Sequence, residues 1–189
     1  MSPPRPWTPE GYAAALRFAA RAHGDQREPV ESLPYLHHVT WVAAEVISAL
    51  REEPGLDEEL AVQCALLHDV LEDTKVRYDE LAVAFGDAVA RGVLSLSKNA
   101  SLPKPEQMRD SLARIRLQPR EVWIVKLADR TCNLHPPLPR HWTRDKALTY
   151  RDEAELILRE LGAGSGHLAR RLRKRIDAYG TVLDAFLAG

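Results

Sequence analysis

The sequence predicts an all-α fold, a bundle of about eight or nine helices. Apolar residues recur at helical spacing through long segments such as YAAALRFAARAH and REVWIVKLADRTCNL. Glycines, prolines and short polar stretches separate these segments. No stretch alternates convincingly with period two, since WIVKLA, the only strand-like run, fits helical spacing at least as well.

Start and stop signals bound the helices of the first half. A Thr-Pro pair opens a helix expected at about 8–23, because threonine caps helices and proline is tolerated in the first turn. After the turn-rich stretch GDQREPVESLP, a second helix is expected at roughly 37–53, before a Pro-Gly pair. Asp57 then caps a third helix, which the apolar spacing predicts to run through 57–73.

In the second half of the chain, glycine, proline or a polar loop likewise separates the helices. These helices are expected at 77–85, 87–98, 105–118, 119–134, 143–161 and 167–187. In a helical bundle, functional sites form where helix ends or facing helices bring polar side chains together.

Composition limits the classes of function. A chain of 189 residues fits one domain, 1–189, and its 45% hydrophobic and 28% charged residues are typical of a soluble globular protein. The net charge of −1 gives no general attraction for nucleic acid, so an anionic substrate needs a local cationic cluster. With no bilayer-length apolar run and no targeting pattern in MSPPRPW, we expect a cytoplasmic protein without a membrane partner.

Two other features are expected to be structural. Cys64 and Cys132 stand in apolar helical patterns and form no CxxC pair, so they should pack as small hydrophobic residues. A dense basic stretch near the C-terminus is more typical of a solvated helix face than of a binding site. It contains Arg170, Arg171, Arg173, Lys174 and Arg175.

The most informative segment is ALLHDVLEDT. On a continuous helix, His68 and Glu72, and likewise Asp69 and Asp73, would be i,i+4 neighbours near one helix end. An imidazole beside a carboxylate suits a divalent cation, and the second acidic pair could orient or deprotonate water. An acidic cap on an ordinary surface helix is an equally good interpretation of this segment alone.

Two further segments offer partners. His37 and His38 stand at the start of the second helix, where helix capping or plain exposure would also explain them. Asp129 lies in an otherwise apolar helix, a costly place for a carboxylate unless it binds a metal or pairs with Lys126 or Arg130.

Together these motifs resemble the hydrolase domain of the RelA/SpoT family, a branch of the HD-domain metal-dependent phosphohydrolases. They occur in the order AH, PYxxH, ALLHDVxEDT with FGxxV, and KLADRxxNL, within a core of about 23–150. The resemblance implies an all-helical HD-domain bundle. It also implies hydrolysis of the 3′-pyrophosphate of guanosine tetra- and pentaphosphate, usually with Mn²⁺.

The resemblance also implies roles for individual residues. The metal ligands by position are His38, His68, Asp69 and Asp129. Such a mixed nitrogen and oxygen site suits Mn²⁺ and also Fe²⁺, Co²⁺ or Zn²⁺. Glu72 and Asp73 match an acidic pair implicated in catalysis, whereas His23 is expected to be a structural histidine and His37 a residue outside the ligand set.

Substrate contacts are also implied by position. They are Arg27, Lys98, Asn133, Lys146 and Tyr150, with Asn133 and Tyr150 near the nucleoside and Lys98 and Lys146 near phosphates. The family has a glutamine and then two adjacent basic residues near Arg27, but here a single arginine is followed by Glu28. One positive charge is therefore missing, which leaves the preference for guanosine or adenosine open.

The leading hypothesis is a small stand-alone hydrolase of the nucleotides ppGpp and pppGpp, since the hydrolase-like segment occupies most of the chain. Adenosine analogues such as ppApp are plausible substrates of the same chemistry. A generic HD-domain phosphohydrolase acting on another phosphoester is a second hypothesis. A catalytically silent nucleotide-binding module is a third, although such a module has no need of Glu72 and Asp73. The sequence gives no information on oligomeric state.

Overall fold

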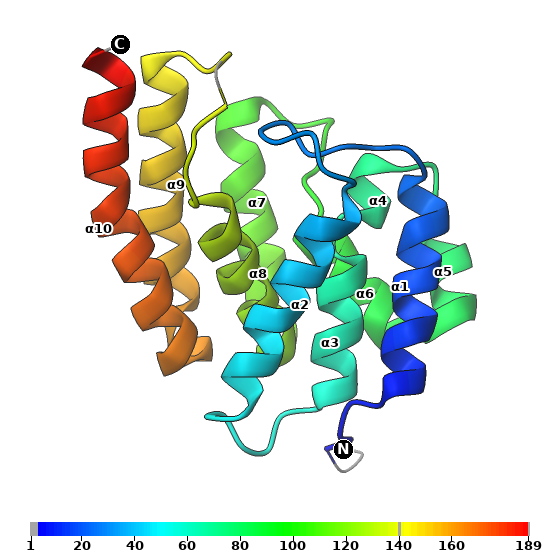
Figure 1. The fold of residues 1–189 in the computed structure, drawn as a ribbon. Coiled ribbons are helices and arrows are strands. Elements are labelled where there is room, and N and C mark those ends of the chain that lie inside the picture. Colours follow the sequence, from blue (N-terminus) through cyan, green and yellow to red (C-terminus); the bar gives the residue numbers. More distant parts are fainter. Residues whose placement is uncertain (1–3, 140, 189) are drawn as a thin grey trace.

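The computed structural model describes residues 4–139 and 141–188 (Figure 1). These residues form nine α-helices of eight or more residues, one single-turn α-helix and one 3-10 turn, with no strand among them. The helices are α1 (Pro9–His23), α2 (Leu36–Leu50), α3 (Glu58–Leu67), α4 (Val70–Asp73), α5 (Tyr78–Phe85), α6 (Asp87–Leu96), α7 (Lys104–Arg116), α8 (Arg120–Asn133), α9 (Arg144–Leu161) and α10 (Gly166–Ala188). The 3-10 turn η1 is Gly162–Gly164. The predicted all-α class is confirmed.

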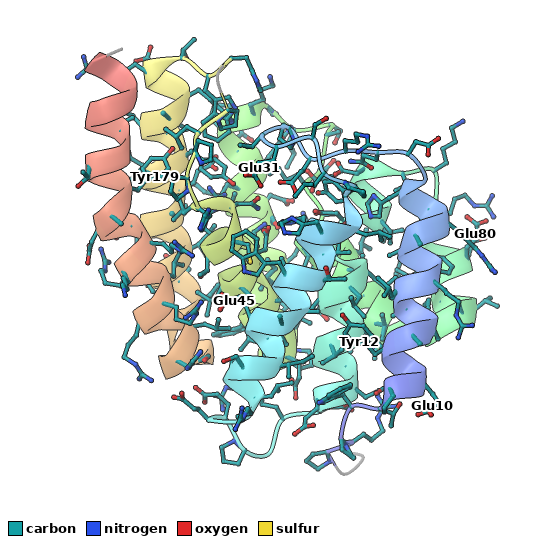
Figure 2. All side chains as sticks on the ribbon, in the orientation of Figure 1. Glu10, Tyr12, Glu31, Glu45, Glu80 and Tyr179 are labelled. Atoms are coloured by element: carbon teal, nitrogen blue, oxygen red, sulfur yellow. The ribbon has the colours of Figure 1, made fainter. Side chains whose placement is uncertain are left out.

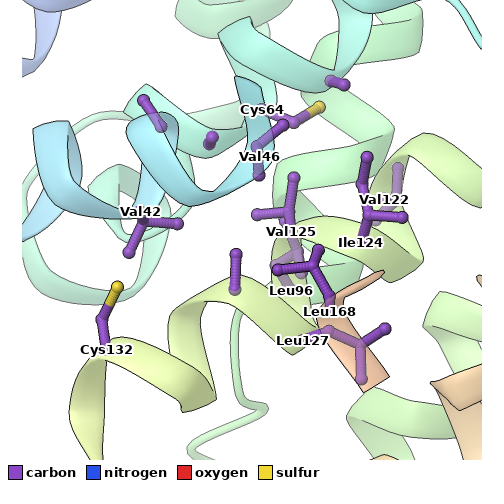
Figure 3. Close-up of a cluster of buried hydrophobic side chains, with 14 of the residues drawn as sticks. Val42, Val46, Cys64, Leu96, Val122, Ile124, Val125, Leu127, Cys132 and Leu168 are labelled. Carbon is purple, nitrogen blue, oxygen red and sulfur yellow. The ribbon is translucent and has the colours of Figure 1, made fainter. Parts of the chain in front are cut away.

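Helix α8 lies at the centre of the bundle. It packs against α2 and α3 on one side and against α9 and α10 on the other, and nearly all of its side chains are buried (Figure 1). Figure 3 shows Val122, Val125 and Leu127 of α8 among the buried apolar side chains that join these layers. Because α8 is enclosed, any charged residue on it must find a partner within the protein.

The predicted helix boundaries agree with the structure to within three residues, with one exception. Helix α2 ends at Leu50 instead of 53, and α6 ends at Leu96, so that Lys98 lies in a loop. The exception lies at the candidate site. The predicted continuous helix over 57–73 is wrong, because α3 ends at Leu67 and α4 begins at Val70.

Both cysteines are free thiols buried in the core, as predicted (Figure 3). The basic stretch of α10 forms ion pairs with neighbouring helices. Arg171 pairs with the buried Glu45 of α2, which is labelled in Figure 2, and Arg173 lies 2.7 Å from Glu155 of α9. These pairs agree with a structural role. None of the described helices is long and apolar enough to cross a lipid bilayer.

Candidate metal centre and substrate cleft

Two histidines and an aspartate meet where three helices begin or end. His38 lies in the first turn of α2, His68 directly follows α3, and Asp69 directly precedes α4. The Nε2 atoms of the two imidazoles are 3.3 Å apart, and His68 Nε2 lies 2.9 Å from Asp69 Oδ2. Each residue offers one ligand atom, and these three atoms lie within 4.8 Å of one another.

Asp129 approaches the same cluster from α8. Its Oδ1 atom lies 3.5 Å from His38 Nε2 and 3.8 Å from His68 Nε2, while its Oδ2 atom lies 3.0 Å from Lys126 Nζ. Asn133 Nδ2 donates to Asp129 Oδ1 at 2.5 Å. The structure therefore brings all four predicted ligands together, and it also contains the ion pair with Lys126 that the sequence left open.

The interruption between α3 and α4 shapes this cluster. His68 Nδ1 lies 2.7 Å from the carbonyl oxygen of Ala65, an acceptor at the end of α3, and this contact turns Nε2 toward Asp69. On a continuous helix the side chains of His68 and Asp69 would diverge by about 100°. The break thus places two adjacent residues on one site.

Electrostatics at the cluster favour charged forms. Burial alone would lower the pKa of His68, but Asp69 and Asp129 outweigh burial and raise it to about 9. Burial alone would raise the pKa of Asp129, but the Lys126 ammonium and the two imidazoles hold it well below its usual range. A divalent cation would take the place of the imidazole protons and bind the same two nitrogens and two carboxylates. The donor set and its burial therefore fit a divalent metal ion.

The acidic pair beyond the cluster divides between two sets of partners. Glu72 accepts a hydrogen bond from the Lys98 backbone N–H at 2.7 Å, and its carboxylate lies 3.3 Å from Lys98 Nζ. Asp73 accepts from Gln26 Nε2 at 3.4 Å. Partial burial, together with the charges of Asp69 and Glu72, raises the pKa of Asp73.

Tyr35 is a site residue to which sequence reasoning gave no role. Its hydroxyl donates to Asp69 Oδ2 at 2.5 Å and lies within hydrogen-bonding reach of Asp73, so it links the ligand cluster to the acidic pair. Its ring packs against His38 and against the buried His23, whose Nδ1 lies 2.9 Å from Gln26. The position of Tyr35 three residues before His38 was the available signal, since residues three apart share a helix face.

A cavity of about 200 Å³ opens beside the cluster. Tyr35 and His38 line it together with Asn133 and Tyr150, so two of the predicted nucleoside contacts face this space. Trp41 and Trp142 add aromatic surface to the walls. Such a mixture of flat apolar walls and a few polar groups suits a nucleoside.

A second cavity, of about 800 Å³, lies between α7 and α9 and contains the predicted phosphate contacts Lys98 and Lys146. Tyr150 lines both cavities and therefore stands between them. The guanidinium of Arg130, which is buried on α8, lies 3.8 Å from the centre of the Tyr150 ring and fixes its orientation. Sequence reasoning did not find Arg130 as a support of the site, because the contact joins residues twenty positions apart.

Arg27 is the predicted contact that the structure does not bring to the site. It lines neither cavity, and its guanidinium donates to the Ser32 carbonyl within its own loop at 2.8 Å. The neighbouring Glu28 lines the smaller cavity instead, and its Oε1 atom lies 2.8 Å from His37 Nδ1. Glu31 of the same loop, labelled in Figure 2, also lines this cavity.

A buried set of two imidazoles and two carboxylates in an all-α bundle is the hallmark of an HD-type metal-dependent hydrolase. Residues 15–157 match the family model described as HD domain, and the chain belongs to this family. The more particular resemblance to RelA/SpoT-type hydrolase domains is confirmed by relatives that match over most of their length.

Two of these relatives carry the name guanosine-3′,5′-bis(diphosphate) 3′-pyrophosphohydrolase MESH1. The protein from Danio rerio is 31% identical, with 89% of this chain and 93% of the relative covered, and the protein from Homo sapiens is 32% identical, with 89% and 94% covered. A solved structure described as a metazoan ortholog of SpoT that hydrolyzes ppGpp superimposes with a TM-score of 0.77. It is 26% identical, and the match covers 92% of this chain and 98% of that one.

Proposed function

We propose that this protein hydrolyses the 3′-pyrophosphate of ppGpp and pppGpp, giving GDP or GTP and pyrophosphate. The observation that carries the proposal is the cluster of His38, His68, Asp69 and Asp129 beside a cavity that His38 lines together with the predicted nucleoside contacts Asn133 and Tyr150. The near full-length similarity to hydrolases named for this reaction supports it.

Within the proposal, those four residues hold the metal, with Mn²⁺ as the preferred ion. A bound divalent ion supplies Lewis acidity both to the phosphoryl group and to water. Tyr35 orients the Asp69 carboxylate, and Lys126 balances the charge of Asp129. Asn133, tied to Asp129, connects the ligand cluster to the nucleoside cavity.

The chain's own acidic pair handles the proton. Glu72 and Asp73 position a water molecule and accept its proton as the water attacks the phosphorus that carries the 3′-oxygen. The bond between that phosphorus and the 3′-oxygen breaks, the 3′-oxygen receives the proton that the acidic pair took from water, and pyrophosphate leaves intact. Lys98 and Lys146 lie at the edge of the larger cavity, where their charges stabilise the phosphoryl oxygens.

The test of this proposal is product identification with ppGpp and metal-loaded protein. We expect GDP and pyrophosphate, and we expect chelation, His68→Ala or Asp69→Ala to abolish turnover, because each removes the ion or one of its ligands. His167→Ala, which removes a pair between the first turn of α10 and Glu52 in the loop after α2, should retain full activity. Activity in chelated protein would overturn the metal assignment. Orthophosphate as the first product would favour a generic phosphohydrolase. Binding of ppGpp without turnover would favour a catalytically silent nucleotide-binding module.

A second set of substrates, adenosine analogues such as ppApp, is favoured by the position of Arg27. Because its guanidinium is bound within the loop, it adds no contact to the nucleoside cavity. We expect kcat/KM for ppGpp and ppApp to lie within about two orders of magnitude of each other. Competition of the two nucleotides in one reaction measures this ratio directly. Strict selection of guanosine would show that other residues of the cavity, such as Glu28, read the base.

A further inference from the structure

The larger cavity is a cationic groove. Five of the residues that line it are positively charged, and two are negatively charged. The cations are Lys98, Lys104, Arg109, Lys146 and Arg159, and the anions are Asp152 and Glu153. The two walls are α7 and α9, which pack side by side (Figure 1).

The negative charges of the groove are largely neutralised from outside it. Glu153 lies 3.2 Å from Arg130, and Asp152 lies 3.1 Å from Arg151, and neither arginine lines the groove. Among the described residues, Lys104, Arg109 and Lys146 form no ion pair with a carboxylate. Arg159 meets Glu160 only through Nε, at 3.5 Å. The groove therefore presents more cationic donors than the protein itself uses.

The groove continues away from the metal cluster. A third cavity, of about 280 Å³, shares Arg109, Leu156 and Arg159 with it, so the two cavities adjoin at the two arginines. At the opposite end, Tyr150 joins the groove to the nucleoside cavity, and Lys98 joins it to Glu72. A nucleotide with its base beside Tyr150 can thus extend a negatively charged phosphate chain toward Arg109 and Arg159.

We propose that this groove binds the 5′-polyphosphate chain of the nucleotide, with Arg109 of α7 and Arg159 of α9 contacting its outer phosphates. The proposal rests on the proposed function for the placement of the nucleoside. Arginine suits the role because its planar guanidinium can donate two parallel hydrogen bonds to one phosphate. Both arginines are exposed, so neither is needed for the core. The groove would then favour substrates with longer 5′ chains, the pentaphosphate above the tetraphosphate.

The direct test measures binding of GMP, GDP and GTP to the metal-loaded protein by calorimetry. We expect affinity to rise with each 5′-phosphate in the native protein. In the double variant R109Q/R159Q the ratio of GTP to GMP affinity should fall by at least about tenfold, the loss expected for one charge-assisted contact. Arg91→Gln, a matched substitution on α6 where the arginine pairs with Asp87 and lines none of these cavities, should leave the ratio unchanged. Melting temperatures confirm that each variant is folded.

A kinetic measurement completes the test. The ratio of kcat/KM for pppGpp to that for ppGpp should drop in R109Q/R159Q and stay unchanged in Arg91→Gln, because only the double variant loses contacts to the outer phosphates. Equal affinities for GMP and GTP in the native protein would overturn the proposal. An increase in affinity from GMP to GTP that is as large in the double variant as in the native protein would also overturn it. Since binding is measured without hydrolysis, the groove can be confirmed even where no pyrophosphate is released, which would contradict only the proposed reaction.

Discussion

Glu72 and Asp73 are neighbours in sequence, yet their surroundings give them unequal chemistry. Glu72 faces the ammonium and the backbone N–H of Lys98, and these contacts tie α4 to the loop after α6. Asp73 has only neutral partners, Gln26 and Tyr35, and its pKa is raised by burial and by neighbouring carboxylates. A carboxylate with a raised pKa is the better proton acceptor, so we assign the base to Asp73 and a positioning role to Glu72.

Replacing both residues separates binding from chemistry. E72Q/D73N keeps side-chain size while removing the charge that accepts a proton. We expect near-native metal stoichiometry and nucleotide binding, with kcat reduced by at least about 10², the lower end for a lost general base. Metal analysis, calorimetry and turnover on the same preparation measure the three properties.

The single variants then divide the effect. Asp73→Asn should reproduce most of the loss, whereas Glu72→Gln should retain more activity because its amide oxygen can still accept from Lys98. Loss of metal from the double variant would make the pair ligands. Near-normal turnover with metal retained would leave the pair a structural role.

At the residue scale, the sequence motifs predicted the four candidate ligands but not the residues that hold the site in place. His38, His68, Asp69 and Asp129 stand in recognisable motifs, and the structure brings them together. Tyr35 and Arg130 act through contacts that depend on the packing of whole helices, which no local pattern encodes. Arg27 shows the reverse case, since its position in the sequence implied a substrate contact but its guanidinium donates to the Ser32 carbonyl of its own loop.

At the element scale, the break between α3 and α4 was the feature that periodicity could not reveal. Apolar residues continue at helical spacing through it, and Leu67 and Val70 on either side of the break are both buried. What interrupts the helix is the bond from the His68 ring to the Ala65 carbonyl and the convergence of polar groups from three helices. Contacts among the candidate metal ligands have thus overridden the local preference for helix.

The packing of α6 against α3 and α8 depends on one glycine. A Cβ atom at Gly92 would lie 2.8 Å from Cys64 Sγ and 3.1 Å from Val122 Cγ2, and both atoms belong to the buried core. Gly92→Ala should therefore lower the free energy of unfolding by about 1–3 kcal/mol, the usual cost of overpacking, in spite of the better helix propensity of alanine. Denaturant unfolding gives the value.

Gly180 provides the matched control. It also lies within a helix, α10, but a Cβ atom there would meet nothing within 4 Å. Gly180→Ala should raise the free energy of unfolding by about 0.5–1 kcal/mol through helix propensity alone. Equal effects of the two substitutions would show that α6 can move away from Cys64 and Val122 without cost.

At the scale of the whole molecule, the candidate metal centre connects parts of the chain that are far apart in sequence. His38 comes from α2, His68 and Asp69 from the junction of α3 and α4, and Asp129 from the central α8. An ion bound there would hold these helices together at one end of the bundle. In the structure, Lys126 and the two imidazoles lie beside these carboxylates and can offset their charge, so we expect the fold to survive removal of the ion.

Chelation should therefore destabilise the protein without unfolding it. A metal that binds only the folded state adds about 2.7 kcal/mol at a free concentration one hundred times its Kd. For a domain of this size, that corresponds to a fall in Tm of roughly 5–10 °C when a chelator replaces Mn²⁺. Thermal unfolding followed by circular dichroism, with ion or chelator in excess, gives the shift. Asp69→Ala should abolish it because a ligand is gone, whereas Asp87→Ala, at an exposed ion pair with Arg91, should preserve it. A shift that persists in Asp69→Ala would mean that the ion stabilises the protein from another place, and the cluster would lose its assignment as the metal centre.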